Sequence, residues 1–279
     1  MRLSLSPSLS LPNAAACLQA SAAAYAQATF ETAKAHVLVV PYDNATILAF
    51  RGSQSPRDFV LDAEVWRSSA GANNIEVHHG FYDAFSSIAG ELLDRATLGD
   101  FTRRPAAQNL QPATCNLQQP IFITGHSLGG ALALLAAKTL FGFGLPIQAV
   151  YTFGQPRVGN AAFALSYDAQ GPGGASGLAD RTYRFVNQDD IVPLLPGLLV
   201  GYRHVGQEVF LPTAGGLVLN RPLWRAALTV ATGTYRLWKN GPLNQLARHY
   251  ATTYNSALAP LLPSSAQSDP SDSPTLAHA

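Results

Sequence analysis

Ser127 lies at the centre of the string Gly-His-Ser-Leu-Gly, between two segments of different character. Residues 121–124 form a short apolar run typical of a buried strand, and the Ala- and Leu-rich residues 130–143 are typical of a helix. Two glycines allow the backbone to turn sharply between strand and helix and leave room around the serine. This context predicts a nucleophile elbow, with the Leu128 amide in the first helical turn facing a developing oxyanion. The alternative is a turn whose serine only caps the helix.

A serine hydroxyl becomes a strong nucleophile only when a base removes its proton and a carboxylate orients that base. When the serine stands on an elbow, the expected chain order is Ser, then Asp or Glu, then His. Residues 181–187 alternate like a strand and are followed by Gln188 and then by Asp189 and Asp190. Active-site groups collect just past the carboxyl ends of strands in open α/β sheets. This pair is therefore predicted to supply the acid.

The histidines that follow this pair are His204, His249 and His278. His278 lies in the terminal tail and is set aside. His204 follows Asp190 closely, within an expected edge strand, so the chain between them is short for a loop that must reach back to the serine. His249 opens an expected terminal helix of residues 244–258 and is our choice for the base. The other histidines are interpreted as structural: His36, His78, His79, His126 and His204.

Several further strings, taken in order, resemble those of one family. They are residues 50–53, 77–82, 124–130, 151–160 and 187–196, followed by His249. The chain is similar to the class 3 lipases, the fungal-type triacylglycerol lipases within the α/β-hydrolases, over most of residues 13–256. By this resemblance Ser127 is the nucleophile, Asp190 rather than Asp189 is the acid, and His249 is the base.

The same resemblance implies a second oxyanion donor at Ser53. A tetrahedral intermediate needs at least two donors, and the elbow amide of Leu128 supplies one. Ser53 directly follows the expected strand of residues 45–50, and the resemblance implies that its amide faces the oxyanion. The alternative is an ordinary turn at the end of a strand.

The composition excludes several other classes of function. The chain has 279 residues, of which 47% are hydrophobic and 13% charged, and its formal net charge is +1. This balance argues against nucleic-acid binding and suits a neutral ester substrate. No His/Cys cluster has metal-ligand spacing and no phosphate-binding loop is present, so we expect no metal and no cofactor. Cys17 and Cys115 form one disulfide or remain two thiols.

The order of expected elements predicts a single-domain α/β-hydrolase with a largely parallel central sheet flanked by helices. We expect one domain over residues 13–258, with flexible termini at residues 1–12 and 259–279. The first helix is expected over residues 14–26, starting at Asn13. The other expected helices are residues 82–97, 130–141, 161–167 and 244–258; the expected strands are residues 36–40, 45–50, 121–124, 147–153 and 181–186.

Two segments are candidates for contact with lipid. Residues 56–62, which include Phe59, Val60 and Leu61, correspond by resemblance to a lid that covers the site and binds substrate. The alternative is a docked surface helix. Residues 222–239 carry apolar side chains at helical spacing and would line an acyl pocket, rest transiently on a membrane or lipid droplet, or face the core.

The sequence thus predicts a serine carboxylic-ester hydrolase, and by resemblance a lipase that cleaves acylglycerol esters through an acyl-enzyme. The alternatives are a phospholipase A1, a feruloyl or small-ester esterase, and a non-catalytic lipid-binding relative. No convincing signal peptide and no apolar run long enough to span a membrane is present, so a cytoplasmic and a secreted location both stay open.

Overall fold

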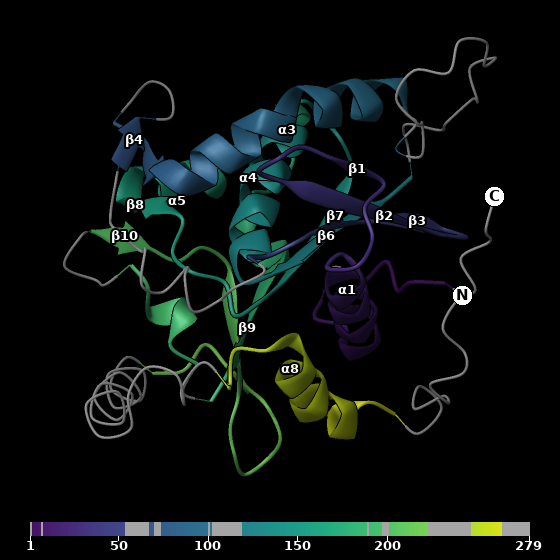
Figure 1. The fold of residues 1–279 in the computed structure, drawn as a ribbon, viewed down its shortest axis with the longest axis vertical. Helices are drawn as coiled ribbons and strands as arrows, with labels where there is room; N and C mark the ends of the chain where they lie inside the picture. The colour runs from purple at the N-terminus through teal and green to yellow at the C-terminus, as the bar shows by residue number, and fades with distance from the viewer. Residues whose placement is uncertain are drawn as a thin grey trace.

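A computed structural model describes most of the chain. The described residues are 2–6, 8–53, 67–69 (backbone only), 74–99, 101, 119–188, 190–196, 201–222 and 247–263. They form a central sheet with helices on both faces (Figure 1).

The central sheet contains eight strands in the order β1-β2-β3-β6-β7-β9-β11-β12. The strands are β1 (Phe30–Glu31), β2 (His36–Tyr42), β3 (Ala45–Phe50), β6 (Ile121–His126), β7 (Ile147–Phe153), β9 (Thr182–Asn187), β11 (Gln207–Leu211) and β12 (Val218–Leu219). The five strands from β3 to β11 run parallel, whereas β1, β2 and β12 join the two edges in antiparallel register. The prediction of a largely parallel α/β-hydrolase sheet is therefore confirmed.

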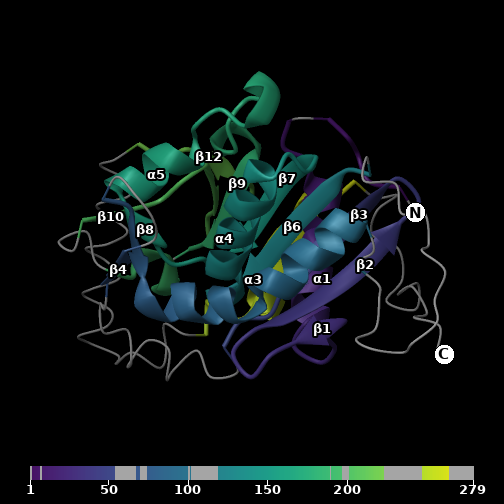
Figure 2. The ribbon, with the colours of Figure 1, turned by 90° about the horizontal axis from the view of Figure 1, so that it is seen from above.

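Helices cover the two faces of this sheet. One face carries α3 (His79–Leu98), α4 (Leu128–Gly142) and α5 (Ala161–Tyr167), and the opposite face carries α1 (Leu11–Ala23) and α8 (Ala251–Leu258) (Figures 1 and 2). β6 is buried along its whole length because both of its faces are covered. Parallel strands covered on both faces read as continuous apolar runs, as this one does.

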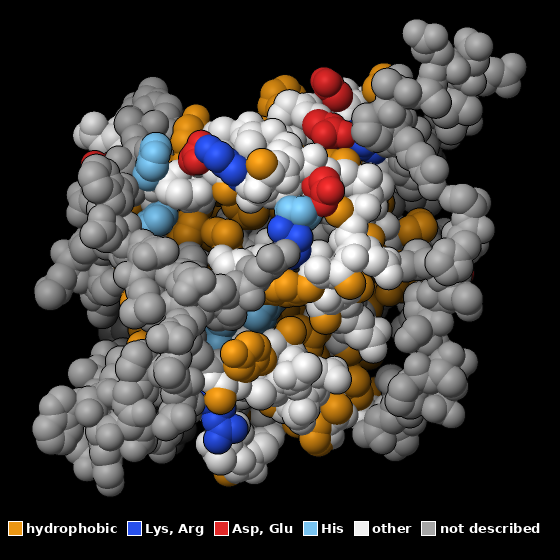
Figure 3. Space-filling model, in the orientation of Figure 1, with side chains coloured by type: hydrophobic (Ala, Val, Ile, Leu, Met, Phe, Trp, Pro, Cys, Tyr) orange, Lys and Arg blue, Asp and Glu red, His pale blue; other side chains and the backbone are white. Residues whose placement is uncertain are grey.

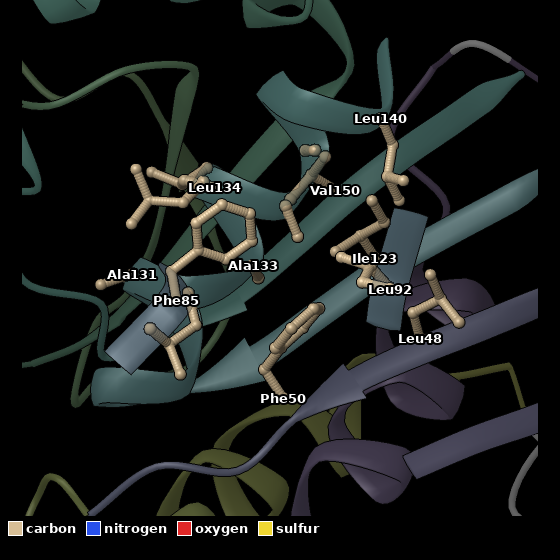
Figure 4. Close-up of a cluster of buried hydrophobic side chains, with 14 of the residues drawn as sticks. Leu48, Phe50, Phe85, Leu92, Ile123, Ala131, Ala133, Leu134, Leu140 and Val150 are labelled. Carbon is tan, nitrogen blue, oxygen red and sulfur yellow. The ribbon is translucent and has the colours of Figure 1, made fainter. Parts of the chain in front are cut away.

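Two hydrophobic clusters fill the spaces on either side of the sheet. In the first cluster, side chains of α3 and α4 such as Phe85, Leu92 and Leu140 pack against Phe50 and Ile123 of the sheet (Figure 4). The second cluster joins α1 and α8 to the other face. Each cluster fixes one face of the strand that leads to Ser127.

A smaller antiparallel sheet lies beside the main one, in the order β10-β8-β5-β4. Its strands are β4 (Arg67–Ser69), β5 (Glu76–His78), β8 (Gly159–Asn160) and β10 (Tyr202–Arg203). Short 3-10 helices occur at Pro172–Gly174, Ala179–Arg181, Val192–Leu194 and Ala259–Leu261. Segments of two or three residues are too short to show a period, so the sequence does not predict them.

The segment before α1 is held against the domain, although we expected residues 1–12 to be flexible. Leu3 is buried, and its amide and carbonyl bond the side chain of Asn44 at 3.0 and 2.8 Å. α1 also starts earlier than expected, because Ser10 caps it by accepting from the Asn13 amide. The Asn13 side chain instead bonds the backbone of Ser4.

Charged side chains are sparse among the described residues on the face shown in Figure 3. Within the described part of the chain, no helix is both long and apolar enough to cross a membrane.

Candidate active site

Ser127 occupies a sharp turn between β6 and α4. Its backbone has φ 59° and ψ −131°, a strained conformation for a residue that is not glycine. The serine amide donates to Phe153 O at 2.9 Å, which anchors the turn to the neighbouring strand β7. A Cβ on Gly129 would lie 2.1 Å from Phe50 O, so only glycine fits at this step of the turn. The elbow expected from the sequence is present.

Asp190 follows β9 and is only 1% exposed. Its carboxylate accepts from His249 Nδ1 at 2.9 Å, from the Tyr254 hydroxyl at 2.6 Å and from the Val192 amide at 3.0 Å. Burial alone would raise the pKa of this carboxyl, but the charge of His249 and the three donors hold the pKa below its usual value. Asp190 is therefore an ionised carboxylate facing an imidazole. Asp189 lies outside the described residues.

His249 lies in a turn just before α8, not inside a helix as we expected. The bond to Asp190 uses Nδ1, so Nε2 is the free ring nitrogen. His249 Nε2 and Ser127 Oγ are both buried, and neither has a hydrogen-bond partner among the residues that the structure describes. Unsatisfied buried polar atoms are costly and are a recognised feature of catalytic sites.

Gly154 permits the acid and the histidine to lie against the end of β7. A Cβ at this position would come within 2.8 Å of Asp190 Oδ2 and of His249 Nδ1. The glycine also has a φ of 61°, which a side chain would disfavour. Gly154 belongs to the string of residues 151–160, but nothing in the sequence indicates its contact with the pair.

His204 lies elsewhere. Its Nε2 donates to Pro193 O at 2.8 Å, while the carboxylate of Asp190 is occupied by His249. The structure therefore favours His249 over His204 as the partner of Asp190. His278 lies outside the described residues.

The turn at Gly52 and Ser53 packs against the elbow. A Cβ on Gly52 would lie 3.1 Å from Ser127 Cβ and 2.5 Å from His126 O. Leu128 is the first residue of α4. The two amides expected to face an oxyanion thus belong to segments in contact beside Ser127. Phe59, Val60 and Leu61 lie outside the described residues.

The geometry agrees with the similarity of this chain to known proteins. The model of the family "Lipase (class 3)" matches residues 47–200. The chain belongs to the class 3 lipase family. It is 31% identical to the secreted mono- and diacylglycerol lipase A of Penicillium cyclopium over 67% of this chain and 54% of the relative. It is 36% identical to a lipase of Rhizomucor miehei over 59% of this chain and 41% of the relative.

Solved structures agree with this assignment. A crystal structure of a mutant form of MDLA from Penicillium cyclopium matches with a TM-score of 0.57 and 26% identity, covering 75% of this chain and 82% of that one. The Rhizomucor miehei triacylglyceride lipase matches with a TM-score of 0.56 and 26% identity, covering 75% and 80%. The chain spans about half the length of the curated relatives it matches.

Two features of the candidate site had no signal in the sequence. Tyr254 donates to Asp190 from α8, and the His126 ring lies against His249. Both contacts join segments distant in the chain, so neither spacing nor periodicity could reveal them. Cys17 has a free, buried thiol, and no group of residues suited to a metal ion occurs within the described ranges.

Proposed function

We propose that this class 3 lipase is a serine carboxylic-ester hydrolase that acts on acylglycerol esters. The observation that carries the proposal is the buried Asp190–His249 pair. The Nε2 atom of His249 and the hydroxyl of Ser127 are both buried and have no hydrogen-bond partner among the described residues. A buried ionised carboxylate that orients an imidazole beside a strained serine is the arrangement that serine hydrolases use for acyl transfer.

In the first half-reaction Ser127 Oγ attacks the ester carbonyl carbon, and His249 Nε2 takes the hydroxyl proton. Asp190 keeps the proton on Nδ1 and stabilises the imidazolium that forms. The amides of Ser53 and Leu128 stabilise the negative oxygen of the tetrahedral intermediate. Collapse of the intermediate breaks the ester C–O bond, and the alcohol leaves with the proton from Nε2.

In the second half-reaction water attacks the acyl-enzyme. His249 Nε2 takes a proton from the water and returns it to Ser127 Oγ when the acyl–oxygen bond breaks. The products are a carboxylic acid and free enzyme, and no cofactor takes part.

The proposal of acylglycerol as substrate rests on family membership and on the names of the relatives. The Penicillium relative is named secreted mono- and diacylglycerol lipase A. A Fusarium solani protein, 30% identical over 80% of this chain, is named secreted mono- and diacylglycerol lipase 1. Both are named as secreted, which supports a secreted over a cytoplasmic location. The lid role of Phe59, Val60 and Leu61, with transient contact to a lipid surface, remains a prediction.

The test compares wild type, Ser127→Ala and Ser166→Ala on p-nitrophenyl butyrate and on mono-, di- and triacylglycerols. Ser166 is a matched control, because its hydroxyl bonds Phe163 O on α5, away from the site. We expect hydrolysis by wild type and Ser166→Ala, and none above background by Ser127→Ala. Wild-type protein that binds but does not hydrolyse these esters would make the chain a non-catalytic relative. A preference for phospholipid or feruloyl esters would contradict acylglycerol as the substrate.

A further inference from the structure

His126, the residue before Ser127, links the histidine of the site to the first helix. Its ring is buried, and the ring centroid lies 4.7 Å from that of His249. His126 Nδ1 bonds the Tyr25 hydroxyl at 2.8 Å, and Nε2 bonds the backbone carbonyl of His249. The two ring nitrogens thus contact two segments that are distant from the elbow in the chain.

The direction of these hydrogen bonds follows from their chemistry. A carbonyl oxygen only accepts, so His126 Nε2 carries the hydrogen and donates to His249 O. Burial, and then the charge of His249, lower the pKa of His126 to about 3, so the ring is neutral and Nδ1 is an acceptor. The Tyr25 hydroxyl must therefore donate to Nδ1. The Tyr25 hydroxyl thus donates to His126, and His126 in turn donates to the His249 carbonyl.

Tyr25 also contacts the turn that contains the second expected oxyanion donor. A Cβ on Gly52 would lie 2.3 Å from the Tyr25 hydroxyl oxygen, and the Gly52 amide bonds that oxygen. Burial raises the pKa of Tyr25 to about 12, although Arg51 and the Gly52 amide oppose this rise, so the hydroxyl stays protonated and able to donate. One phenol thus joins the Gly52–Ser53 turn to His126.

The hydrogen bonds of Tyr25 and His126 hold parts of the site that lie outside helices and strands. His249 lies in a turn at residues 247–250, outside the helices and strands of the described chain, and His126 bonds its carbonyl. An elbow needs small residues around the serine, but it does not need an imidazole before it. Burying a neutral imidazole is costly unless both nitrogens have partners, and Tyr25 and His249 are those partners.

We propose that Tyr25 and His126 are positioning residues that hold the backbone of His249 and the Gly52–Ser53 turn in register with Ser127. The inference rests on the proposed function, because it assigns these residues a role in the same reaction. Neither residue exchanges a proton with substrate. Each acts by fixing where the base and the oxyanion donor lie.

The kinetic test uses variants that remove or retain single hydrogen bonds. Tyr25→Phe deletes the hydroxyl, His126→Leu deletes both ring nitrogens, and His126→Gln keeps an N–H able to reach the His249 carbonyl. A misplacement of about 1 Å costs roughly a hundredfold in rate. We therefore expect kcat on p-nitrophenyl butyrate to fall about tenfold in Tyr25→Phe and about a hundredfold in His126→Leu. KM should change little, and His126→Gln should recover much of the loss.

Tyr167→Phe is the matched control. It deletes a buried tyrosine hydroxyl that bonds Thr182 at 2.9 Å, on the α5 side of the sheet. We expect a similar loss of thermal stability to that of Tyr25→Phe, with kcat unchanged. Equal kcat in the two Phe variants, or a His126→Gln variant no better than His126→Leu at the same folded fraction, would overturn the proposal.

A second measurement is made on the wild-type protein, so it depends neither on activity nor on the folding of a variant. Nitrogen-15 NMR of the histidine rings in the wild-type protein should show His126 neutral at pH 7, with its hydrogen on Nε2. A charged ring, or a hydrogen on Nδ1, would overturn the proposal. Wild-type protein without esterase activity would refute the proposed function instead, whereas loss of activity in Ser127→Ala with an unaffected Tyr25→Phe would refute the positioning role alone.

Discussion

Gly154→Ala tests whether the site depends on the close approach of β7 to the Asp190–His249 pair. The added Cβ would lie 2.8 Å from Asp190 Oδ2 and from His249 Nδ1, whereas ordinary contacts begin at 3.4 Å. The pair must therefore move by about the difference, 3.4 − 2.8 = 0.6 Å, or the strand must yield. Because a 1 Å misplacement of reacting groups costs roughly a hundredfold, we expect kcat to fall about tenfold to a hundredfold.

The backbone contributes a separate effect on stability. Gly154 has a φ of 61°, and an L-residue in this left-handed region costs about 1–2 kcal/mol. For a domain of this size, each kcal/mol lowers Tm by roughly 2–4 °C, so the expected decrease is about 2–8 °C. Differential scanning calorimetry measures this decrease, and steady-state kinetics on p-nitrophenyl butyrate measures the change in kcat.

Gly144→Ala separates the two effects. Gly144 has a φ of 79°, and a Cβ there would have nothing within 4 Å. The effect of alanine on the unfolded chain is the same at both positions. We expect Gly144→Ala to lower Tm by a similar amount and to leave kcat unchanged. If the two variants lost kcat equally, the steric reasoning about Gly154 would be refuted.

The remaining predictions concern the triad, its acid and the buried thiol. Ser127→Ala and His249→Ala should each lower kcat by about a millionfold, with little further loss in the double variant because the residues act as a unit; additive losses would contradict this. The pKa of Asp190 is lowered on folding, so its contribution to stability is present above the pKa of the unfolded group and is lost as pH falls through the folded pKa. The Tm difference between wild type and Asp190→Asn should therefore shrink in acid, and a constant difference from pH 7 to pH 3 would be inconsistent with that linkage. The Cys17 thiol is buried and its pKa is raised by burial, so Cys17→Ser should not change the number of thiols that react with Ellman's reagent in the native protein, whereas it should lower that number in guanidinium.

The parallel sheet was predictable because its strands are buried on both faces. The runs at residues 45–50, 121–124 and 147–153 are short and apolar, and each is followed by a turn signal. The elbow was predictable for a local reason, because its glycines lie between a strand pattern and a helix pattern. The chain order of such sites then indicated a carboxylate of the Asp189–Asp190 pair followed by a later histidine. The resemblance to the class 3 lipases selected Asp190 and His249.

The rest of the site depends on contacts between segments distant in the chain. Tyr254 reaches Asp190 from α8, and Tyr25 reaches His126 from the end of α1. His126 was interpreted as structural, because a single histidine in an apolar segment has no pattern of its own. Local capping was also misjudged. Asn13 precedes an alanine run and is a good cap by type, but Ser10 caps α1 while Asn13 bonds Ser4.

The contact between α1 and α8 has a consequence for biosynthesis. These helices lie far apart in the chain but pack together on the same face of the sheet, and His249 immediately precedes α8. A nascent chain emerges from the ribosome in order, so Ser127 and Asp190 are available before His249. If His249 is the base, as proposed, the serine has no base until α8 docks, and the emerging polypeptide is expected to be inert toward esters. On that proposal, the order of synthesis delays hydrolysis until the fold is closed.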